Sequence, residues 1–222
     1  MKGNLMDKFI LILTAVEAEK DAVVRGLRGD ERFEAHAAGV GPAAAAVTAA
    51  AALASNPGHY SLVVSAGIAG GFAGVAPVGS VVIASESIAA DLGAETTDGF
   101  VPVDELGFGS NRLPVDGDVA ARLTERLRDD NIPVAFGPVL TLSTVTGTAM
   151  TAAALAERYP GVAAEAMEGF GIAAAADRFG VPFLEIRAVS NAVGPRDRSA
   201  WRIGDALAAL ESACSTLTEV LK

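Results

Sequence analysis

The chain has few of the residues that build disulfides and metal centres, with one cysteine and two histidines among 222 residues. A disulfide needs two cysteines, so Cys214 cannot form one within the chain, and so few histidines and cysteines offer little to a metal ion. We therefore expect a reducing, cytoplasmic setting and no structural metal.

Basic residues are also scarce, because 17 lysines and arginines stand against 27 aspartates and glutamates, a formal net charge of −10. Such a surface repels nucleic acid and anionic membranes, so the expected partner is a small molecule. No apolar run reaches the roughly 18 residues that span a bilayer. The apolar run 9–16 lacks a small-residue cleavage site and is followed by Glu17, Glu19 and Lys20, unlike a signal peptide.

Hydrophobic residues make up 51% of the chain and charged residues 20%, which is typical of a globular protein. The length suits one sizeable core. We expect a single domain over residues 8–222, preceded by an N-terminal extension over residues 1–7.

Apolar runs of strand length alternate with segments of helical spacing. This alternation predicts a mainly parallel sheet with helices on both faces. The expected strands are 9–14, 33–38, 61–66, 78–90, 134–144, 162–166 and 182–190, and the expected helices are 16–27, 43–55, 118–130, 148–158, 168–179 and 201–221. We expect loops at 67–72, which is rich in glycine, and at 91–115, which has no clear periodicity.

Polar residues at strand ends are the first functional candidates, because ligands of α/β sheets bind outside the carboxyl ends of the strands. Glu168 could hold two ribose hydroxyls, since an ionised carboxylate only accepts hydrogen bonds, or it could be a helix-terminal acid. Asn191 could contact a ligand or form a turn. Glu17 and Glu19 fall in an expected first helical turn, where an acid is favoured whether or not it takes part in catalysis. If Glu19 lines the site, it could act as a general base on water.

The glycine-rich segment 67–71 and the arginines near Asn191 could each serve function or structure alone. The glycines of 67–71 fail the Gly-x-Gly-x-x-Gly spacing, so they indicate close approach to a ligand rather than a nicotinamide cofactor. Arg196 and Arg198, near Asn191, could supply a cation for an anionic substrate, although most such arginines are surface charges. His36, His59 and Trp201 suit packing or surface positions.

Four segments, in order, resemble the nucleoside phosphorylase/hydrolase superfamily typified by methylthioadenosine/S-adenosylhomocysteine nucleosidase; they are Ala15–Glu19, Ala66–Gly71, Ala166–Gly169 and Arg187–Asn191. Segments 165–171, 184–198 and 200–203 most resemble the futalosine hydrolase family, which serves a bacterial menaquinone pathway. The resemblance implies a three-layer α/β/α fold with a mixed, mainly parallel, partly barrel-like sheet, and a homodimer or larger assembly. It also implies cofactor-free hydrolysis of futalosine to hypoxanthine through an oxocarbenium-like transition state.

The same resemblance implies roles for single residues. Glu19 would activate water, Glu168 would bind the ribose hydroxyls, and Met167 would pack against the sugar. Ala66 and Gly67 would belong to the loop that binds the base. The family's stacking aromatic is missing from 144–150, which leaves Phe170 and Phe100 as candidates. The substrate's carboxylated tail would meet Arg196, Arg198 or the 91–113 loop of a partner subunit.

Departures from the family pattern favour one reaction. Asn191 stands where adenine-specific nucleosidases have aspartic acid, and its amide can donate to a 6-oxo group, which favours hypoxanthine. An amide cannot be a general acid, so N7 could be protonated by water or Asp197, or need no proton. Phosphorylases have arginines after the first strand and a serine in the glycine loop, where this chain has Glu17, Glu19 and Ile68. Carboxylates repel phosphate, so hydrolysis is favoured.

Two alternatives stay open at this stage. One is a methylthioadenosine-type nucleosidase, which would release adenine. The other is a nucleoside-binding or storage protein that keeps the fold without catalysis, although Glu19 and Glu168 together favour an enzyme.

Overall fold

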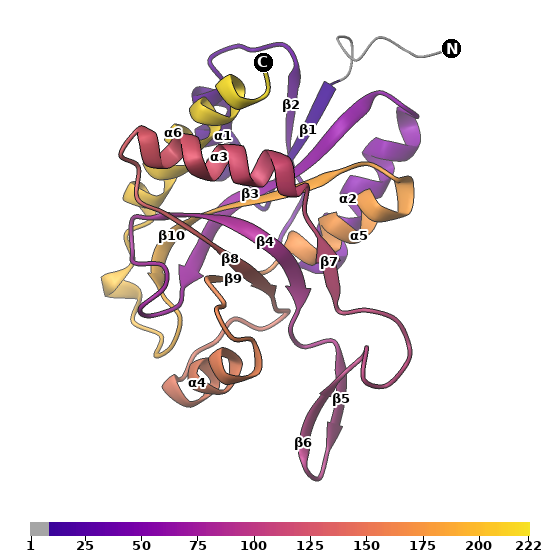
Figure 1. Ribbon diagram of the computed structural model, residues 1–222, viewed down its shortest axis with the longest axis vertical. Helices are drawn as coiled ribbons and strands as arrows, with labels where there is room; N and C mark the ends of the chain where they lie inside the picture. The colour runs from indigo at the N-terminus through magenta and orange to yellow at the C-terminus, as the bar shows by residue number, and fades with distance from the viewer. Residues whose placement is uncertain (1–8) are drawn as a thin grey trace.

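The computed structural model describes residues 9–222, and the expected extension 1–7 lies outside the described residues. Strands and helices alternate along most of the chain, as their sequence spacing predicts (Figure 1). The strands are β1 Phe9–Thr14, β2 Phe33–Ala37, β3 Tyr60–Gly71, β4 Val81–Ala89, β5 Gly93–Thr96, β6 Gly99–Pro102, β7 Arg112–Pro114, β8 Val134–Thr141, β9 Ala164–Ala166 and β10 Phe183–Ala192. The α-helices are α1 Glu17–Leu27, α2 Pro42–Ser55, α3 Gly117–Asp129, α4 Ala149–Arg158, α5 Gly169–Phe179 and α6 Ile203–Val220, and Arg198–Ala200 forms a 3-10 turn.

The central sheet closes on itself. Strand β3 pairs with β10 in parallel and with β9 in antiparallel orientation, and β4 and β8 complete the ring between β10 and β9. Strands β1 and β2 extend the sheet from β3 in parallel, and β7 pairs with β4. The expected mixed, mainly parallel, partly barrel-like sheet is therefore confirmed.

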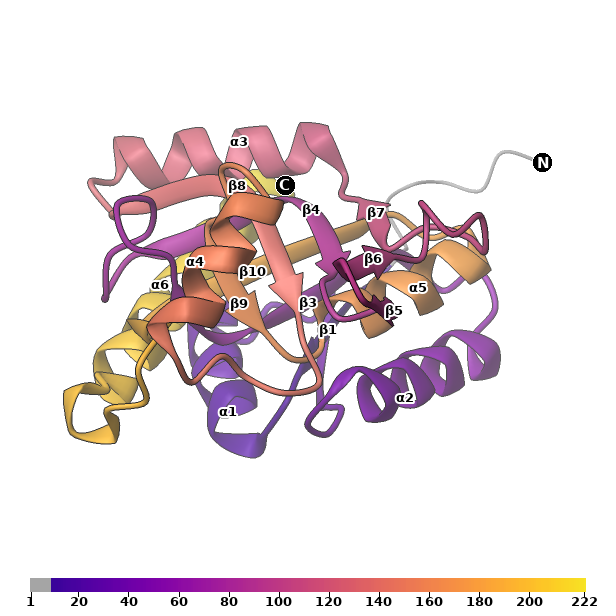
Figure 2. The same cartoon turned by 90° about the horizontal axis from the view of Figure 1, so that it is seen from below.

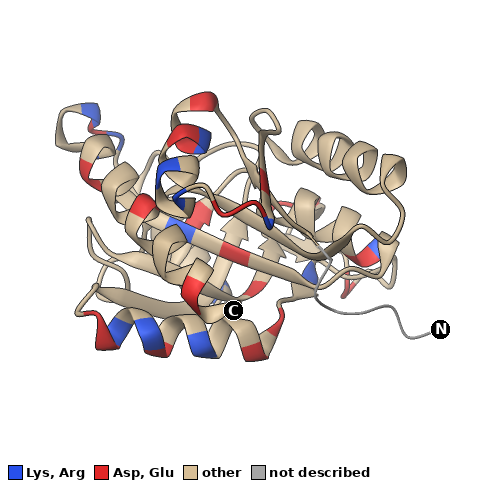
Figure 3. Cartoon of the chain, turned by 90° about the horizontal axis from the view of Figure 1, so that it is seen from above, with Lys and Arg blue, Asp and Glu red and all other residues tan. Residues whose placement is uncertain are grey.

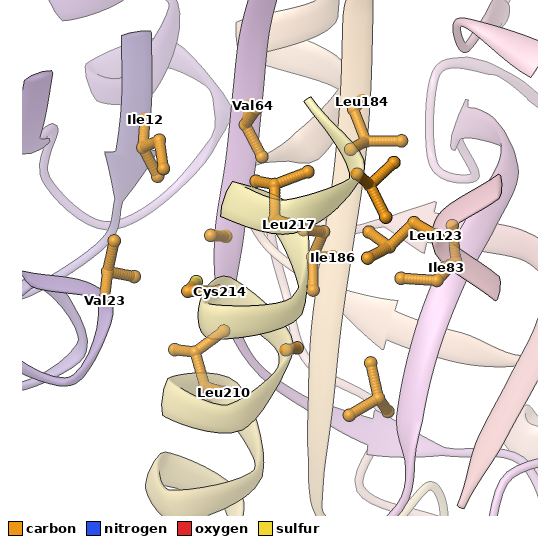
Figure 4. Close-up of a cluster of buried hydrophobic side chains, with 14 of the residues drawn as sticks. Ile12, Val23, Val64, Ile83, Leu123, Leu184, Ile186, Leu210, Cys214 and Leu217 are labelled. Carbon is orange, nitrogen blue, oxygen red and sulfur yellow. The ribbon is translucent and has the colours of Figure 1, made fainter. Parts of the chain in front are cut away.

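Two helical layers cover this sheet (Figure 2). Helices α1, α3 and α6 pack together on one side, and α2 packs against α5 on the other. In the first layer, Leu184 and Ile186 of β10 meet Leu210 and Leu217 of α6, with Cys214 between them (Figure 4). Fully burying one such side chain contributes about 1.5–3 kcal/mol, so this layer is a main source of stability.

The expected loop at 67–72 is wrong, because β3 continues as strand to Gly71. Its glycines permit close packing rather than a turn. A Cβ on Gly71 would lie 2.2 Å from the carbonyl oxygen of Ala76, and Gly70 pairs with Glu165 of β9. Glycine here lets strand β9 and the following turn approach the barrel.

The expected irregular loop at 91–115 is also wrong in part. It contains the antiparallel hairpin β5–β6 and the short strand β7. The hairpin extends away from the body of the domain (Figure 1). Its strands have four residues each, too short for a periodic pattern to stand out.

Charged residues are unevenly distributed over the helices and strands (Figure 3). Helix α3 carries both signs along its length, whereas α2 has no charged residue between Pro42 and Ser55. Within residues 9–222, none of the helices combines the length and apolar character needed to cross a membrane.

Candidate active site

A cavity of about 260 Å³ opens where β1, β3 and β10 end and where the chain leaves β9. This is the sheet edge at which α/β proteins bind ligands. Its lining residues are Ala15, Val16, Glu19, Val40, Ile68, Ala69, Gly70, Val145, Thr146, Glu165, Ala166, Met167, Glu168, Ser190, Asn191, Ala192, Val193, Gly194, Pro195, Arg196 and Trp201. Of the residues that the sequence singled out, Glu19, Met167, Glu168, Asn191 and Arg196 meet in this one cavity.

Glu19 lies in the first turn of α1, and its carboxylate is held by three backbone N–H groups. Oε2 accepts hydrogen bonds from Ala15 N at 2.9 Å and Val16 N at 3.2 Å, and Oε1 accepts one from Ile68 N at 2.9 Å. The residue is 4% exposed. Two carboxylate oxygens offer about four lone-pair sites, so one acceptor site on Oε1 remains for a ligand or water.

Gly67 provides the space in which this carboxylate sits. A Cβ on Gly67 would lie 2.8 Å from Glu19 Oε1 and 2.9 Å from Arg187 Nη1, closer than real Cβ contacts. Gly67 does not line the cavity itself, and neither does the buried Ala66 before it. The glycine therefore acts on the site by letting two charged side chains approach β3.

Glu168 is the N-cap of α5, and this buried residue lines the cavity. Oε1 accepts a hydrogen bond from Gly41 N at 3.1 Å. Oε2 lies 3.6 Å from Nη1 of the buried Arg187. These contacts hold the carboxylate while leaving it acceptor sites for ligand hydroxyls.

Behind Glu168, the guanidinium of Arg187 is fully enclosed. Its Nε donates to Glu185 Oε1 at 2.9 Å and its Nη2 donates to Ser65 Oγ at 2.7 Å. Burial raises the pKa of the Glu185 carboxyl, and the positive charge of Arg187 opposes that rise. Arg187 is therefore bound to the protein on three sides, and it is not a free cation for a ligand.

Asn191 is the next-to-last residue of β10, and its amide is oriented by its neighbours. Oδ1 accepts a hydrogen bond from Ser190 Oγ at 2.8 Å, and Nδ2 donates to the Ala192 carbonyl at 3.0 Å. An amide nitrogen has two hydrogens, so one remains to donate into the cavity. The arrangement suits a ligand atom that accepts.

Glu165 is a third buried carboxylate in the lining, which the sequence interpretation missed as a site residue. Oε1 accepts from Thr146 N at 2.7 Å and Oε2 accepts from Thr146 Oγ1 at 2.5 Å. Burial raises the pKa of Glu165, and the hydrogen bonds from Thr146 oppose that rise. These two hydrogen bonds attach the segment after β8 to β9 at the cavity wall. The signal in the sequence was an acid within a short apolar strand.

Trp201 is the aromatic side chain that lines the cavity, although the sequence favoured a packing or surface position for it. The guanidinium carbon of Arg196 lies 5.2 Å from its ring centre and that of Arg198 lies 5.8 Å from it. Arg196 lines the cavity and Arg198 does not. Together these three residues form a cationic aromatic cluster at the mouth.

The two aromatic residues considered for stacking lie elsewhere. Phe170 is outside the lining, and its backbone N–H donates to Thr141 Oγ1 at 2.8 Å. Phe100 is on the β5–β6 hairpin, where Arg158 covers its ring at 4.5 Å. Glu17 also lies outside the lining and forms an ion pair with Lys20 on the surface.

In the part of the chain that the structure describes, no three His, Cys, Asp or Glu side chains are grouped to hold a metal ion. The chemistry that this site offers consists of fixed carboxylates, one oriented amide and a cationic mouth. A carboxylate with a free acceptor site can take a proton from water, and a second carboxylate can bind hydroxyls.

The chain belongs to the phosphorylase superfamily, whose family model matches residues 19–222. Among its relatives, the futalosine hydrolase of Streptomyces coelicolor is 53% identical over 234 residues, covering 96% of each chain. The futalosine hydrolase of Acidothermus cellulolyticus is 49% identical over 218 residues, covering 93% of this chain and 89% of that one. The solved futalosine hydrolase of Helicobacter pylori shares the fold, with a TM-score of 0.83 at 14% identity, covering 97% of this chain and 99% of that one. The expected family is confirmed.

Proposed function

We propose that this protein hydrolyses the N-glycosidic bond of futalosine, releasing hypoxanthine and dehypoxanthine futalosine. Two relatives that are about half identical to the whole chain are futalosine hydrolases. The observation that carries the chemistry is the Glu19 carboxylate, which three backbone N–H groups hold at the cavity wall with one acceptor site left.

In the proposed reaction Glu19 is the general base. A water molecule donates one proton to Oε1 as its oxygen bonds to C1′ of the ribose, and the electron pair of the C1′–N bond leaves with the base. The departing hypoxanthine takes up one proton from solvent, because no amide can supply it. Glu19 then releases to solvent the proton that it took from water, so the products together hold the atoms of futalosine and one water molecule and no further reactant is consumed.

Glu168 would hold the ribose during this step. Its two oxygens keep acceptor sites for adjacent sugar hydroxyls, and Met167 lies beside it in the lining. The sugar becomes positively charged as the bond breaks. Two carboxylates around it would stabilise that charge more than the neutral ground state, which lowers the barrier.

Asn191 would bind the base. Ser190 occupies one of the two acceptor sites of its oxygen, and its nitrogen keeps one hydrogen for the cavity. Hypoxanthine offers this hydrogen acceptors at O6 and N7, whereas adenine offers it N7 and could use the amide only through N7 or through the remaining acceptor site of the oxygen. The geometry therefore supports hypoxanthine as the released base.

The charges favour water over phosphate as the nucleophile. Glu19 occupies the place of attack, and Arg187, the nearest buried cation, is already bound by Glu185 and Ser65. A phosphate beside these carboxylates would be repelled by several kcal/mol in a poorly screened site. Arg196, the cation of the lining, lies at the mouth.

We further propose that the carboxylated tail of futalosine lies at this mouth. Arg196 and Arg198 would meet its carboxylate, and Trp201 would contact its aromatic ring. The two arginines are the anionic-tail candidates that the sequence suggested. Ala66, Gly67 and Phe170 would contribute behind the lining through the backbone of β3 and α5.

A homodimer or larger assembly, working in the cytoplasm, is part of the proposal. Helix α2 carries no charged residue, and Val47 on it is 70% exposed. An uncharged, exposed helix face suits contact with a second copy. Cys214 is free and buried, as suits a reducing compartment. Light scattering of the purified protein would give the assembly size, and a monomer at micromolar concentration would count against it.

The experiment that tests the function is base release by the purified protein, followed by chromatography. Futalosine, inosine and methylthioadenosine are offered side by side, first without and then with phosphate. We expect hypoxanthine from futalosine at a rate independent of phosphate. Adenine from methylthioadenosine would favour the sister nucleosidases, dependence on phosphate would contradict the role of Glu19, and no release would favour a binding protein.

A further inference from the structure

A fully buried carboxylate stands behind the site and takes no part in the reaction proposed above. Glu185 lies on β10 between Leu184 and Ile186, which pack into the α6 layer. Side chains alternate along a strand, so Glu185 points the other way, into the barrel. Its exposed fraction is 0%, Oε1 accepts from Arg187, and Oε2 has no hydrogen-bond partner within residues 9–222.

Stability alone does not account for this residue. Replacing a buried ion pair by apolar side chains of similar volume is often neutral or stabilising, because desolvation offsets the attraction of the charges. Here the cost is raised further, since Arg187 also lies 3.6 Å from Glu168, so two buried carboxylates share one guanidinium. The arrangement therefore points to a role in the site.

The contacts of Arg187 show how such a role works. A guanidinium is planar and rigid, so fixing two of its edges fixes the third. Glu185 binds Nε and Ser65 binds Nη2, which directs Nη1 to Glu168 Oε2 at 3.6 Å. Without Glu185, the guanidinium would be free to rotate away from Glu168.

A second contact links Glu185 to the backbone that carries Glu168. A Cβ on Gly169, the residue after Glu168, would lie 2.1 Å from Glu185 Oε1 and 2.4 Å from its Cδ. The carboxyl group of Glu185 therefore packs directly against the first residue of α5. The carboxyl group of Glu185 therefore supports both the side chain of Glu168, through Arg187, and the backbone next to Glu168, through Gly169.

We propose that Glu185 is a positioning residue, which fixes Arg187 and the start of α5 so that Glu168 stays directed at the ribose hydroxyls. The inference rests on the proposed function only in naming the sugar as the ligand of Glu168. Its consequence is specific: the preference for a 2′-hydroxyl on the substrate depends on Glu185, a residue that never touches the substrate.

The experiment compares kcat/KM for futalosine and 2′-deoxyfutalosine in each variant. A purely structural defect lowers both values and leaves their ratio unchanged. The test variants are Glu185→Leu and Glu185→Gln, which keeps an acceptor for Arg187 Nε. Leu184→Ala is the matched control, because it weakens the same strand on its opposite face.

In Glu185→Leu we expect the preference for the 2′-hydroxyl to fall by at least about tenfold, the range of a hydrogen bond to a charged group. Glu185→Gln should stay within about threefold of the wild type, and Leu184→Ala should keep the wild-type ratio. Should Glu185→Leu fail to fold with Arg187 unpaired, the double variant Glu185→Leu/Arg187→Met removes both charges and should show the same loss.

An unchanged ratio in Glu185→Leu or in the double variant would overturn the proposal. So would a loss in Glu185→Gln as large as that in Glu185→Leu. If the wild-type protein releases no base, the proposed function fails by itself. The same ratio is then measured from the calorimetric dissociation constants of futalosine and 2′-deoxyfutalosine, which test Glu185 independently.

Discussion

Replacing Glu19 by glutamine removes a proton acceptor from the cavity while keeping the length of the side chain. General-base catalysis contributes about 10²–10⁴-fold, so kcat for futalosine should fall by that factor, or about 3–5 kcal/mol in the barrier. Binding should persist, because Glu168 and Asn191 are unchanged. Futalosine binding by calorimetry and hypoxanthine release by chromatography separate the two effects.

The same substitution has a cost in stability that follows from the contacts of Glu19. Its oxygens accept from Ala15 N, Val16 N and Ile68 N, but glutamine has a single oxygen. With that oxygen at the Oε2 position, the amide nitrogen faces the Ile68 N–H, donor against donor. One buried donor without a partner costs about 1–3 kcal/mol, which urea unfolding would measure.

Glu17→Gln is the matched control, since it makes the same chemical change two residues earlier. Glu17 is exposed, forms a surface ion pair with Lys20, and lies outside the cavity. It should keep wild-type activity and stability within about 0.5 kcal/mol. Retention of more than a tenth of the activity by Glu19→Gln, or an equal loss in Glu17→Gln, would refute the assignment of the base.

Three further substitutions or titrations test other parts of the structure. Gly67→Ala would place its Cβ 2.8 Å from Glu19 Oε1, so kcat should fall by about tenfold or more, whereas Gly204→Ala, in α6 with open space around it, should be neutral in the same assay. Asn191→Asp should lower hypoxanthine release from futalosine by about tenfold and raise adenine release from methylthioadenosine, as chromatography of both bases would show; an unchanged ratio would contradict its role. Burial raises the pKa of Tyr60 to about 12 in the folded protein, above its ordinary value near 10. The neutral phenol therefore contributes to stability below about pH 10, and this contribution is lost as the pH rises to about 12. Tyrosinate absorbance from Tyr60 near pH 10 in the native protein would contradict the raised pKa.

Much of the fold follows from hydrophobic spacing alone. Apart from the end of β3, the spacing of apolar residues places the main strands and helices within a few residues of their observed bounds. Spacing failed where backbone contacts decide the structure. Gly70 and Gly71 have the composition of a loop, yet they extend β3 because β9 and Ala76 pack where side chains would stand. Closure of the barrel is a long-range pairing that no local pattern contains.

The candidate site divides in the same way. Glu19, Glu168 and Asn191 interrupt apolar runs at strand ends, so their convergence on one edge could be predicted from sequence. Trp201 could not, because it follows a loop whose path depends on tertiary packing. The place of Glu165 in the site was also missed, because it depends on a long-range contact. Thr146, nineteen residues away, donates hydrogen bonds to both of its carboxylate oxygens.

The charges around the cavity favour one type of reaction, the hydrolysis of a glycosidic bond. Glu19 and Glu168 line the cavity, and the buried guanidinium of Arg187 is hydrogen-bonded to Glu185 and Ser65. The site therefore presents net negative charge to the sugar. At an effective dielectric constant of 20, a single charge pair 4 Å apart gains about 4 kcal/mol, so a cationic, oxocarbenium-like sugar is stabilised while an anionic nucleophile is repelled by a similar amount. Neutral water meets no such barrier, so the proposed roles of Glu19 and Glu168 favour hydrolysis over phosphorolysis at this site.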